Sequence, residues 1–405
     1  MSEANRGADP PQKKPMSGAL LDDGGGRRLA AALNPGPGGA QVALATAAAV
    51  VVALALSSAL VAATGGSPSG AVDALYEGSL SSMSSVSTTL LYTAPLLLVA
   101  VGTCVCVRAG VFNLGQEGQV LVGALAGAWI GLRLAVPGPA LVLIALVAAA
   151  LAGGAWAGIS ALMHRVRGVN IVVSTLLMTF LAQQFVAYTV NTPWLLQETR
   201  SGASTVSAQS NRLPADAMIG SFGEYPGLQV NGALLIALLA AVVVAVLIAR
   251  SRWGFRLTML GLNPRAARHA GVRVAALSGT ALAVSGAFAG VAGAVLLASP
   301  VGNNRLQQGI SGNVGWDGLL VALVARNRPL MAVPVALLFG VLRSGGGFLA
   351  STGVPAFLVD VVKSLLVLAF VVPPVLTGAL RRRRADRRAA TEAPAPDEAK
   401  EAIPT

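Results

Sequence analysis

Long apolar segments recur along almost the whole chain and restrict its possible folds more than any other feature. A helix needs about 20 apolar residues to cross the hydrocarbon core of a bilayer. Only 11% of the 405 residues are charged, against roughly 25% in a soluble domain. We therefore expect an all-α membrane protein with about ten transmembrane helices, the eighth of them short enough to be a partial span. The segments run over residues 40–63, 86–107, 114–133, 139–163, 170–190, 231–249, 274–299, 311–325, 329–350 and 356–378.

Lysine and arginine indicate on which side of the membrane each loop lies. With the N-terminus inside, most basic residues of the short loops also fall inside, as the positive-inside rule requires. Both termini are then cytoplasmic. The net charge of +12 does not call for a nucleic-acid partner, because the charges gather between apolar segments in the pattern of membrane orientation.

The polar regions divide the chain into three parts. Residues 1–39 and 379–405 have little apolar content, so we predict a disordered cytoplasmic N-terminal tail and a disordered basic cytoplasmic C-terminal tail. Residues 40–378 form the predicted transmembrane domain. It has an external loop at 191–230 and a cytoplasmic loop at 250–273, whose amphipathic sequence predicts a short helix on the membrane surface.

A short motif occurs twice, once at the start of the third apolar segment and once at the start of the eighth. The copies are NLGQEG, beginning at Asn113, and NVGWDG, beginning at Asn313. Spans 2–5 would then match spans 7–10 in opposite orientation, and inverted repeats of this kind place the solute at the interface between the repeats. Each copy is also consistent with plain capping, because Asn is a good N-cap and a carboxylate in the first turn complements the helix dipole.

Polar residues within the spans are the candidates for a substrate pathway. The fifth span carries a polar stripe at helical spacing, and polar stripes in a membrane face protein or water rather than lipid. Hydrogen bonding between helices is the alternative explanation for the stripe, as capping is for Glu117 and Asp317. The candidates are Asn113, Glu117, Gln119, Thr175, Thr179, Gln183, Asn313 and Asp317.

The remaining polar groups predict structure rather than chemistry. Arg343, Asp360 and Lys363 fall in the last two spans and are interpreted as an ion-pair cluster. Cys104 and Cys106 lie inside an apolar segment, so we expect no disulfide and no metal site. We also find no phosphate-binding loop and no nucleophile beside a base, and expect neither a catalytic residue nor a cofactor.

Several stretches resemble ABC importer permeases of the ribose and branched-chain amino acid superfamily. They are RAGVFNLGQEGQ from Arg108, NIVVST from Asn170, GLNPRAARHAG from Gly261, GWDGLLVAL from Gly315, and Gly353-Val354-Pro355. The resemblance covers roughly residues 40–380 and is closest to permeases of nucleoside importers that work with a basic-membrane-protein-type lipoprotein. The chain departs from the family in the last span, where Lys363-Ser364 stands in place of a common Gln-Gly pair.

The resemblance implies a plasma-membrane permease that imports a small hydrophilic solute, most closely a nucleoside, with ribose, another sugar or a branched-chain amino acid as alternatives. It implies cytoplasmic ATPase partners, a second and often paralogous permease subunit, and an extracellular solute-binding lipoprotein. A secondary transporter and a membrane-embedded enzyme remain alternatives from other classes. The resemblance also identifies an ATPase coupling loop, formed by Gly261, Asn263, Pro264, Ala267, Arg268 and Gly271.

Overall fold

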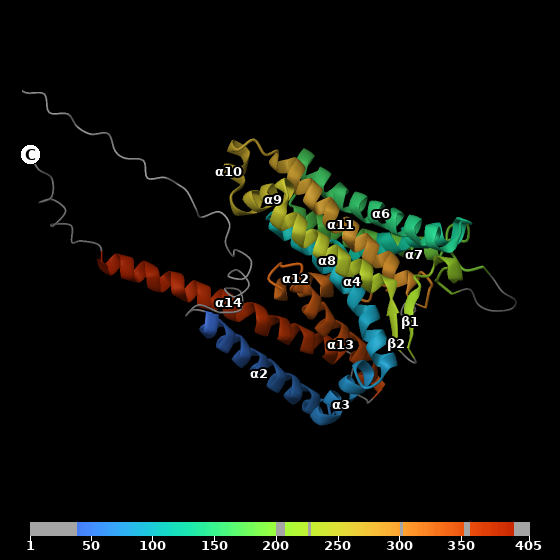
Figure 1. Cartoon of the computed structure of the whole chain (residues 1–405), viewed down its shortest axis with the longest axis horizontal. Coiled ribbons are helices and arrows are strands. Elements are labelled where there is room, and N and C mark those ends of the chain that lie inside the picture. The colour runs from blue at the N-terminus through green and yellow to red at the C-terminus, as the bar shows by residue number, and fades with distance from the viewer. Residues whose placement is uncertain (1–38, 200–206, 226–227, 300–302, 352–356, 393–405) are drawn as a thin grey trace, which may run out of the picture. The chain divides into compact units, whose positions relative to one another are not determined.

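The protein is largely helical (Figure 1). Its computed structural model describes residues 39–199, 207–225, 228–299, 303–351 and 357–392, so the predicted N-terminal tail lies almost wholly outside the described residues. Among the described helices, seven are long and apolar enough to cross a membrane. They are α2 (Gly39–Ala63), α4 (Met83–Arg108), α6 (Gly138–Arg167), α7 (Ile171–Val190), α8 (Gly232–Arg250), α11 (Val274–Ala298) and α13 (Ala332–Ser351).

The other three predicted spans are also helical. They are α5 (Gln116–Arg133), α12 (Val314–Val324) and α14 (Phe357–Glu392). The first turns of α5 carry Gln116, Glu117 and Gln119, which lower its mean hydropathy. At 11 residues, α12 is about 17 Å long, little more than half of a hydrocarbon core of about 30 Å.

The helix α14 corrects one prediction from the sequence. It extends to Glu392, so residues 379–392 are helical where a disordered tail was expected. Alanine and arginine make up most of this stretch, and both are strong helix formers. A helix already nucleated inside the protein therefore continues into them. A further helix that the sequence did not predict, α3 (Pro68–Ser79), lies between the first two spans.

The chain divides into two compact units. The larger unit comprises residues 50–371 and contains most of the spans. The smaller unit comprises residues 1–49 and 372–405, of which the structure describes the beginning of α2 and the C-terminal part of α14.

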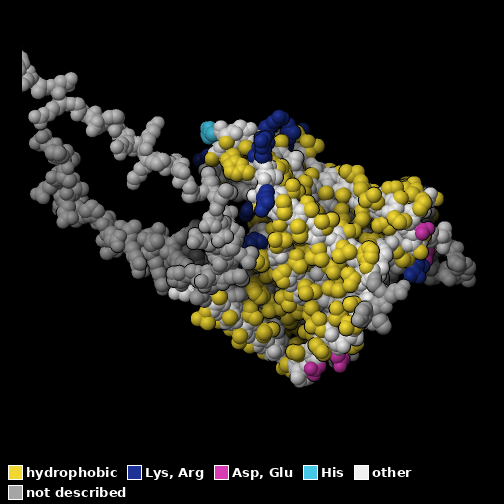
Figure 2. Space-filling view, in the orientation of Figure 1, with side chains coloured by type: hydrophobic (Ala, Val, Ile, Leu, Met, Phe, Trp, Pro, Cys, Tyr) yellow, Lys and Arg dark blue, Asp and Glu magenta, His cyan; other side chains and the backbone are white. Residues whose placement is uncertain are grey.

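Two helices, α4 and α11, form the centre of the larger unit. Within the most apolar stretch of each helix, 78% of the residues of α4 and 72% of the residues of α11 are buried. On α4 pack α12 and α13, and on α11 pack α5 and α6, while α4 and α11 also contact each other. The face of the molecule drawn in Figure 2 is mostly apolar, as expected of a protein that is surrounded by lipid.

Close packing at the centre depends on glycine. Glycines lie at Gly123, Gly286 and Gly290, where the backbones of α5, α6 and α11 touch. A Cβ built on Gly290 would collide with the carbonyl oxygen of Ala149, and one built on Gly123 would collide with Gly290 itself. Without a hydrophobic driving force between helices in lipid, such close approach supplies the van der Waals contact that holds them together. Gly158 is the exception, since nothing lies within 4 Å of its Cβ position.

The long loop at 191–230 has structure of its own. It contains a 3-10 turn (Ala215–Ala217) and the strands β1 (Ser221–Tyr225) and β2 (Leu228–Asn231), which pair antiparallel. Glu198 in this loop forms an ion pair with Arg305. Hydrogen bonds from Gln209 and from Arg305 lower the pKa of Glu198 below its ordinary value, so this carboxylate is charged at neutral pH and ties the loop to the segment after α11.

The loop at 250–273 contains two helices where the sequence predicted one. They are α9 (Arg252–Leu262) and α10 (Pro264–His269). Lysine and arginine side chains gather around this end of the molecule in Figure 2. The side chain of Ser251 caps α9 at Gly254, and that of Asn263 caps α10.

Replacing Gly290 by alanine should destabilise the protein. The added methyl group meets the backbone of α6, and overpacking of this kind costs about 1–3 kcal/mol. Melting of the detergent-solubilised protein, followed by gel filtration after heating, measures the effect. Gly158→Ala is the matched control and should be neutral or stabilising, because alanine is favoured over glycine in a helix by about 1 kcal/mol. Equal melting temperatures for the two variants would contradict the packing described.

Candidate functional site

The N-termini of α5 and α12 meet at one buried carboxylate. Glu117, in the first turn of α5, accepts a hydrogen bond from the backbone amide of Gly315 at 2.7 Å and another from the hydroxyl of Ser311. A Cβ on Gly315 would collide with the backbone of Glu117, so only glycine permits this approach. Glu117 is 3% exposed. Its carboxyl group therefore lies between two helix N-termini, both of which carry a partial positive charge.

Capping at these two helices differs from the local capping predicted from the sequence. The side chain of Asn113 accepts from the amide of Gly115 at 3.0 Å, but the N-cap residue of α5 is Gly115 itself. Asn313 is the N-cap residue of α12 and has φ 69°, yet its side chain forms no capping hydrogen bond. Asparagine tolerates this left-handed conformation better than most residues do. The acceptor for the amide of Gly315 at the start of α12 is instead the carboxylate of Glu117, which belongs to the first copy of the motif.

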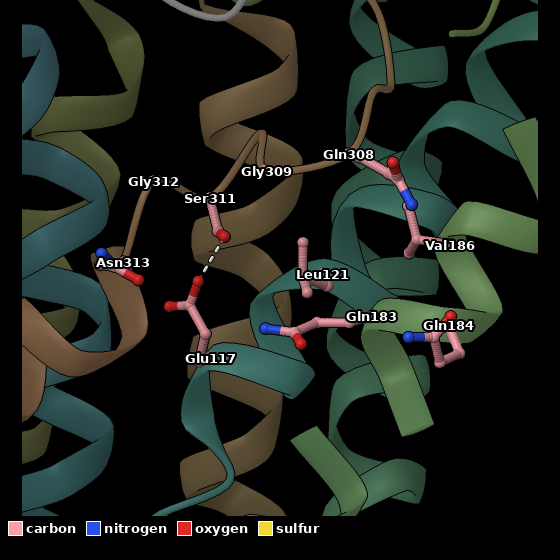
Figure 3. A pocket seen from close by; sticks show the side chains of 10 residues that line it. All are labelled: Glu117, Leu121, Gln183, Gln184, Val186, Gln308, Gly309, Ser311, Gly312 and Asn313. Carbon is pink, nitrogen blue, oxygen red and sulfur yellow. Dashed lines mark hydrogen bonds between the residues drawn. The ribbon is translucent and has the colours of Figure 1, made fainter. Parts of the chain in front are cut away.

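A polar cavity of about 420 Å³ opens beside Glu117 (Figure 3). Its wall comes from α5, from α7 and from the segment that leads into α12. Five of the ten lining residues offer amide or hydroxyl groups, and the described lining contains neither lysine nor arginine. The cavity can thus exchange many hydrogen bonds with a neutral, polar solute. It is lined by Glu117, Leu121, Gln183, Gln184, Val186, Gln308, Gly309, Ser311, Gly312 and Asn313.

Three of the eight residues predicted for a pathway line this cavity, namely Glu117, Gln183 and Asn313. Asn113 and Gln119 lie elsewhere, in a buried network. Their side-chain amides pair at 2.8 and 3.1 Å, and Asn113 also donates to Ser285 of α11. Gln116, which the sequence did not single out, donates to the same Ser285 at 3.1 Å and accepts from Thr103 of α4. The network ties three helices together and leaves its polar groups satisfied, as an apolar surrounding requires.

The threonine stripe of α7 faces α5 rather than the cavity. Thr175 and Thr179 are 0% and 2% exposed, and both hydroxyls donate to carbonyls of their own helix. Gly115 and Gly118 of α5 lie directly against these two threonines, where a Cβ would come within 2.7 Å. Thr175 also accepts a hydrogen bond from the backbone amide of Leu114, which precedes α5, at 3.3 Å. The two threonines therefore pack against α5, while Gln183 one turn further on reaches the cavity.

Asp317 stands at the centre of an ion cluster that the sequence predicted without it. Its carboxylate lies 3.3 Å from Arg343 and 3.3 Å from Lys363, and Lys363 lies 3.0 Å from Asp360. Arg343 also donates to the backbone carbonyls of Gly312 and Ser311. Two acids and two bases leave no net charge, which is what a group of charges within a span needs. The cluster holds the segment before α12 in place from behind the cavity.

The coupling residues form one compact corner between α9 and α10. Gly261 lies against the end of α4, where a Cβ would collide with the carbonyl oxygen of Arg108. Asn263 accepts from the amides of Arg265 and Ala266 at 3.0 and 3.1 Å, and Pro264 opens α10 as the first helical residue.

The rest of the corner is divided between buried and exposed positions. Ala267 is 0% exposed, whereas Leu262 beside the corner is 83% exposed. Arg268 is exposed in the last turn of α10, and Gly271 ends the corner with φ +81°. Ala267 is therefore a packing residue, and any surface for a partner is formed by its neighbours.

Gln184, Gln308 and Ser311 line the cavity but were not among the eight residues predicted for a pathway. Gln184 is adjacent to Gln183 and is equally exposed on α7, so a wider polar stripe was the available signal. Gln308 and Ser311 lie in a loop, where polar residues are ordinary and carry no periodic signal.

Comparison with known proteins gives one family and several relatives. The family described as "Branched-chain amino acid transport system / permease component" matches residues 85–371. A glucose ABC transporter permease of Haloferax volcanii is 32% identical over 309 residues, which cover 74% of this chain and 80% of that protein. A guanosine ABC transporter permease of Bacillus subtilis is 33% identical over 298 residues, covering 73% and 83%. A nucleoside ABC transporter permease of Lactococcus lactis is 27% identical over 337 residues, covering 82% and 91%.

Glu117→Ala should destabilise the protein more than Glu117→Gln does. Alanine leaves the buried amide of Gly315 and the hydroxyl of Ser311 without their acceptor, which costs about 1–3 kcal/mol for each group. Glutamine can still accept from Gly315 and donate to Ser311, so it should retain most of the stability. Thermal unfolding of the two purified variants in the same detergent measures the difference, and equal stability would show that the contact between α5 and α12 does not depend on this acceptor.

Proposed function

The chain belongs to the family of branched-chain amino acid transport system permease components, and we propose that it carries nucleosides into the cell as the permease subunit of an ATP-driven importer. Membership rests on the match over residues 85–371 and on relatives aligned along most of their length. As such a permease, the protein crosses the plasma membrane several times and works with separate ATPase subunits and a solute-binding protein. Membership in this family excludes the two alternatives from other classes, a secondary transporter and a membrane-embedded enzyme.

The observation that carries the solute proposal is the cavity beside Glu117. A nucleoside is neutral and presents hydroxyl groups together with donors and acceptors on its base. Gln183, Gln184 and Gln308 each offer both a donor and an acceptor. Among the described lining residues no cation is available for the carboxylate of an amino acid, so the cavity favours a nucleoside or a sugar over a branched-chain amino acid.

A sugar is the second candidate. The Haloferax volcanii relative is named for glucose and is about as similar to this chain as the Bacillus subtilis relative, which is named for guanosine. The cavity alone does not separate the two, because hydroxyl groups and amides suit both. The nucleoside is favoured because the relatives from Bacillus subtilis and Lactococcus lactis are named for guanosine and for nucleosides.

The inverted repeat is part of the proposal. Exchange of spans 2–5 with spans 7–10 maps α4 onto α11, α5 onto α12 and α6 onto α13. The packing of α11 on α6 and α5 then corresponds to the packing of α4 on α13 and α12, and the contact of α5 with α12 maps onto itself. This correspondence supports the repeat and gives a reason why the cavity lies where α5 and α12 begin.

The assembly of the transporter is also a proposal. A second permease subunit, often a paralog in such systems, would complete the pathway, and an extracellular lipoprotein would deliver the solute. The corner between α9 and α10 would receive the ATPase on the cytoplasmic side, with Leu262 as the exposed apolar contact.

Cysteine labelling tests both the orientation and the coupling corner. In a background with Cys104 and Cys106 replaced by alanine, Leu262→Cys should react with an impermeant maleimide only from the cytoplasmic side. Addition of the ATPase subunits should reduce its labelling severalfold. Ser207→Cys, exposed in the loop at 191–230, is the matched control and should react only from outside. Labelling of both positions from one side would contradict the orientation, and labelling of Leu262→Cys that the ATPase leaves unchanged would contradict the docking site.

Uptake by a strain lacking the chromosomal permease tests the solute. Labelled guanosine and uridine should accumulate when this chain and its partners are expressed, and glucose, ribose and leucine should not. Gln183→Leu should raise the apparent KM about threefold to tenfold, because it removes one hydrogen bond to the solute. Thr179→Val, buried on the same helix, should change it little. Accumulation of glucose instead of nucleosides would establish the second candidate.

The same uptake assay decides the role of the carboxylate. If Glu117 contacts the solute, Glu117→Gln lowers uptake or shifts its preference even when expression is matched. If Glu117 only joins α5 to α12, Glu117→Gln leaves the kinetics unchanged and the remaining lining residues define the site.

A further inference from the structure

An apolar groove lies on the lipid side of three spans, away from the polar cavity. It has a volume of about 500 Å³ and is bounded by α5, α6, α7 and the residues that follow α7. Its deeper wall is aliphatic and includes Val122, Leu125, Ala148 and Ala152. A groove in the membrane-embedded surface cannot stay empty without losing the van der Waals contacts of its walls.

Aromatic side chains mark one end of this groove. Trp129, Tyr188 and Trp194 line it and are 40%, 56% and 70% exposed. Tryptophan and tyrosine with an exposed polar edge are enriched at the level of the lipid headgroups. The groove therefore runs from the headgroup region into the hydrocarbon core, the direction in which a phospholipid lies.

A cation stands at the aromatic end. The guanidinium of Arg133 lies 4.8 Å from the centroid of the Trp129 ring, and it donates to the carbonyl of Leu195 at 2.9 Å. Among the described residues, no carboxylate forms an ion pair with Arg133. The side chain is exposed, and its other N–H groups can donate to a phosphate.

We propose that this groove binds one anionic phospholipid, with an acyl chain along α5, α6 and α7 and the phosphate at Arg133. The positive charge selects the headgroup, and the shaped apolar wall selects this position over the surrounding lipid. A span of a second permease subunit is a weaker occupant. Helix interfaces in lipid favour small residues, whereas one end of this groove carries the large exposed rings of Trp129, Tyr188 and Trp194. Arg133 beside them forms no ion pair with any described carboxylate. The proposal depends on the membrane location and not on the identity of the solute.

Native mass spectrometry of the full-length chain purified with its ATPase partners tests the proposal. The probes are phosphatidylglycerol and phosphatidylcholine with identical acyl chains, added in equal amounts after delipidation. The unaltered protein should retain one phosphatidylglycerol per copy, at least fivefold in preference to phosphatidylcholine. Arg133→Gln should abolish the preference, and Arg133→Lys should restore most of it.

A pair of substitutions on one helix tests the groove itself. Ala148→Phe fills the groove and should lower retention of phosphatidylglycerol at least fivefold. Ala155→Phe places the same ring at an exposed position of α6 outside the groove and should retain lipid as the unaltered protein does. If Ala148→Phe does not fold, Arg133→Gln still decides the question, since its side chain is exposed.

Two results would overturn the proposal. One is equal retention of both lipids by the unaltered protein, with no difference between Arg133→Gln and Arg133→Lys. The other is efficient disulfide cross-linking of Ala126→Cys between two permease subunits, which would show that protein and not lipid occupies the groove.

Discussion

The structure depends on the approach of two helix N-termini inside a membrane, made possible by the carboxylate of Glu117. Two positive helix ends would repel each other, and their free amides would have no water to bind. The carboxyl group of Glu117 accepts a hydrogen bond from the amide of Gly315, and the absence of a side chain on Gly315 makes room for the contact. With these ends joined, polar backbone and side chains can surround a cavity at a depth where lipid would exclude them.

The two polar systems on either side of this contact have different tasks. The network around Asn113, Gln119 and Ser285 is fully buried and joins α5 to the central helices. The cluster around Asp317 anchors the other side, because Arg343 binds both the acid and the carbonyls of the segment before α12. Between them, Gln183, Gln184 and Gln308 face open space. The polar groups of the network and of the cluster support the cavity, and the side-chain amides of the three glutamines belong to its lining.

The sequence predicted most of the fold because lipid imposes a simple rule on length and hydropathy. It could not predict the site as well, because the site is made by contacts between distant residues. Glu117 was expected to act on its own helix, yet its partners lie almost 200 residues away at Ser311 and Gly315. Thr175 and Thr179 have the periodicity expected of a pore lining, but Gly115 and Gly118 let the start of α5 pack directly against them. The C-terminal tail was predicted to be disordered from its composition alone, but composition does not show that a preceding helix can extend into the tail.

The shortness of α12 has a consequence for how the protein is made. An 11-residue helix with an acidic side chain gains little by entering lipid alone, since a carboxylate at mid-membrane costs about 2.5–3.5 kcal/mol on insertion. The cations that compensate Asp317 belong to α13 and α14 and leave the ribosome later. We therefore expect insertion of α12 to depend on the two helices that follow it, so that α12, α13 and α14 enter the membrane together. A substitution at Lys363 would act first on biogenesis, before any solute is encountered.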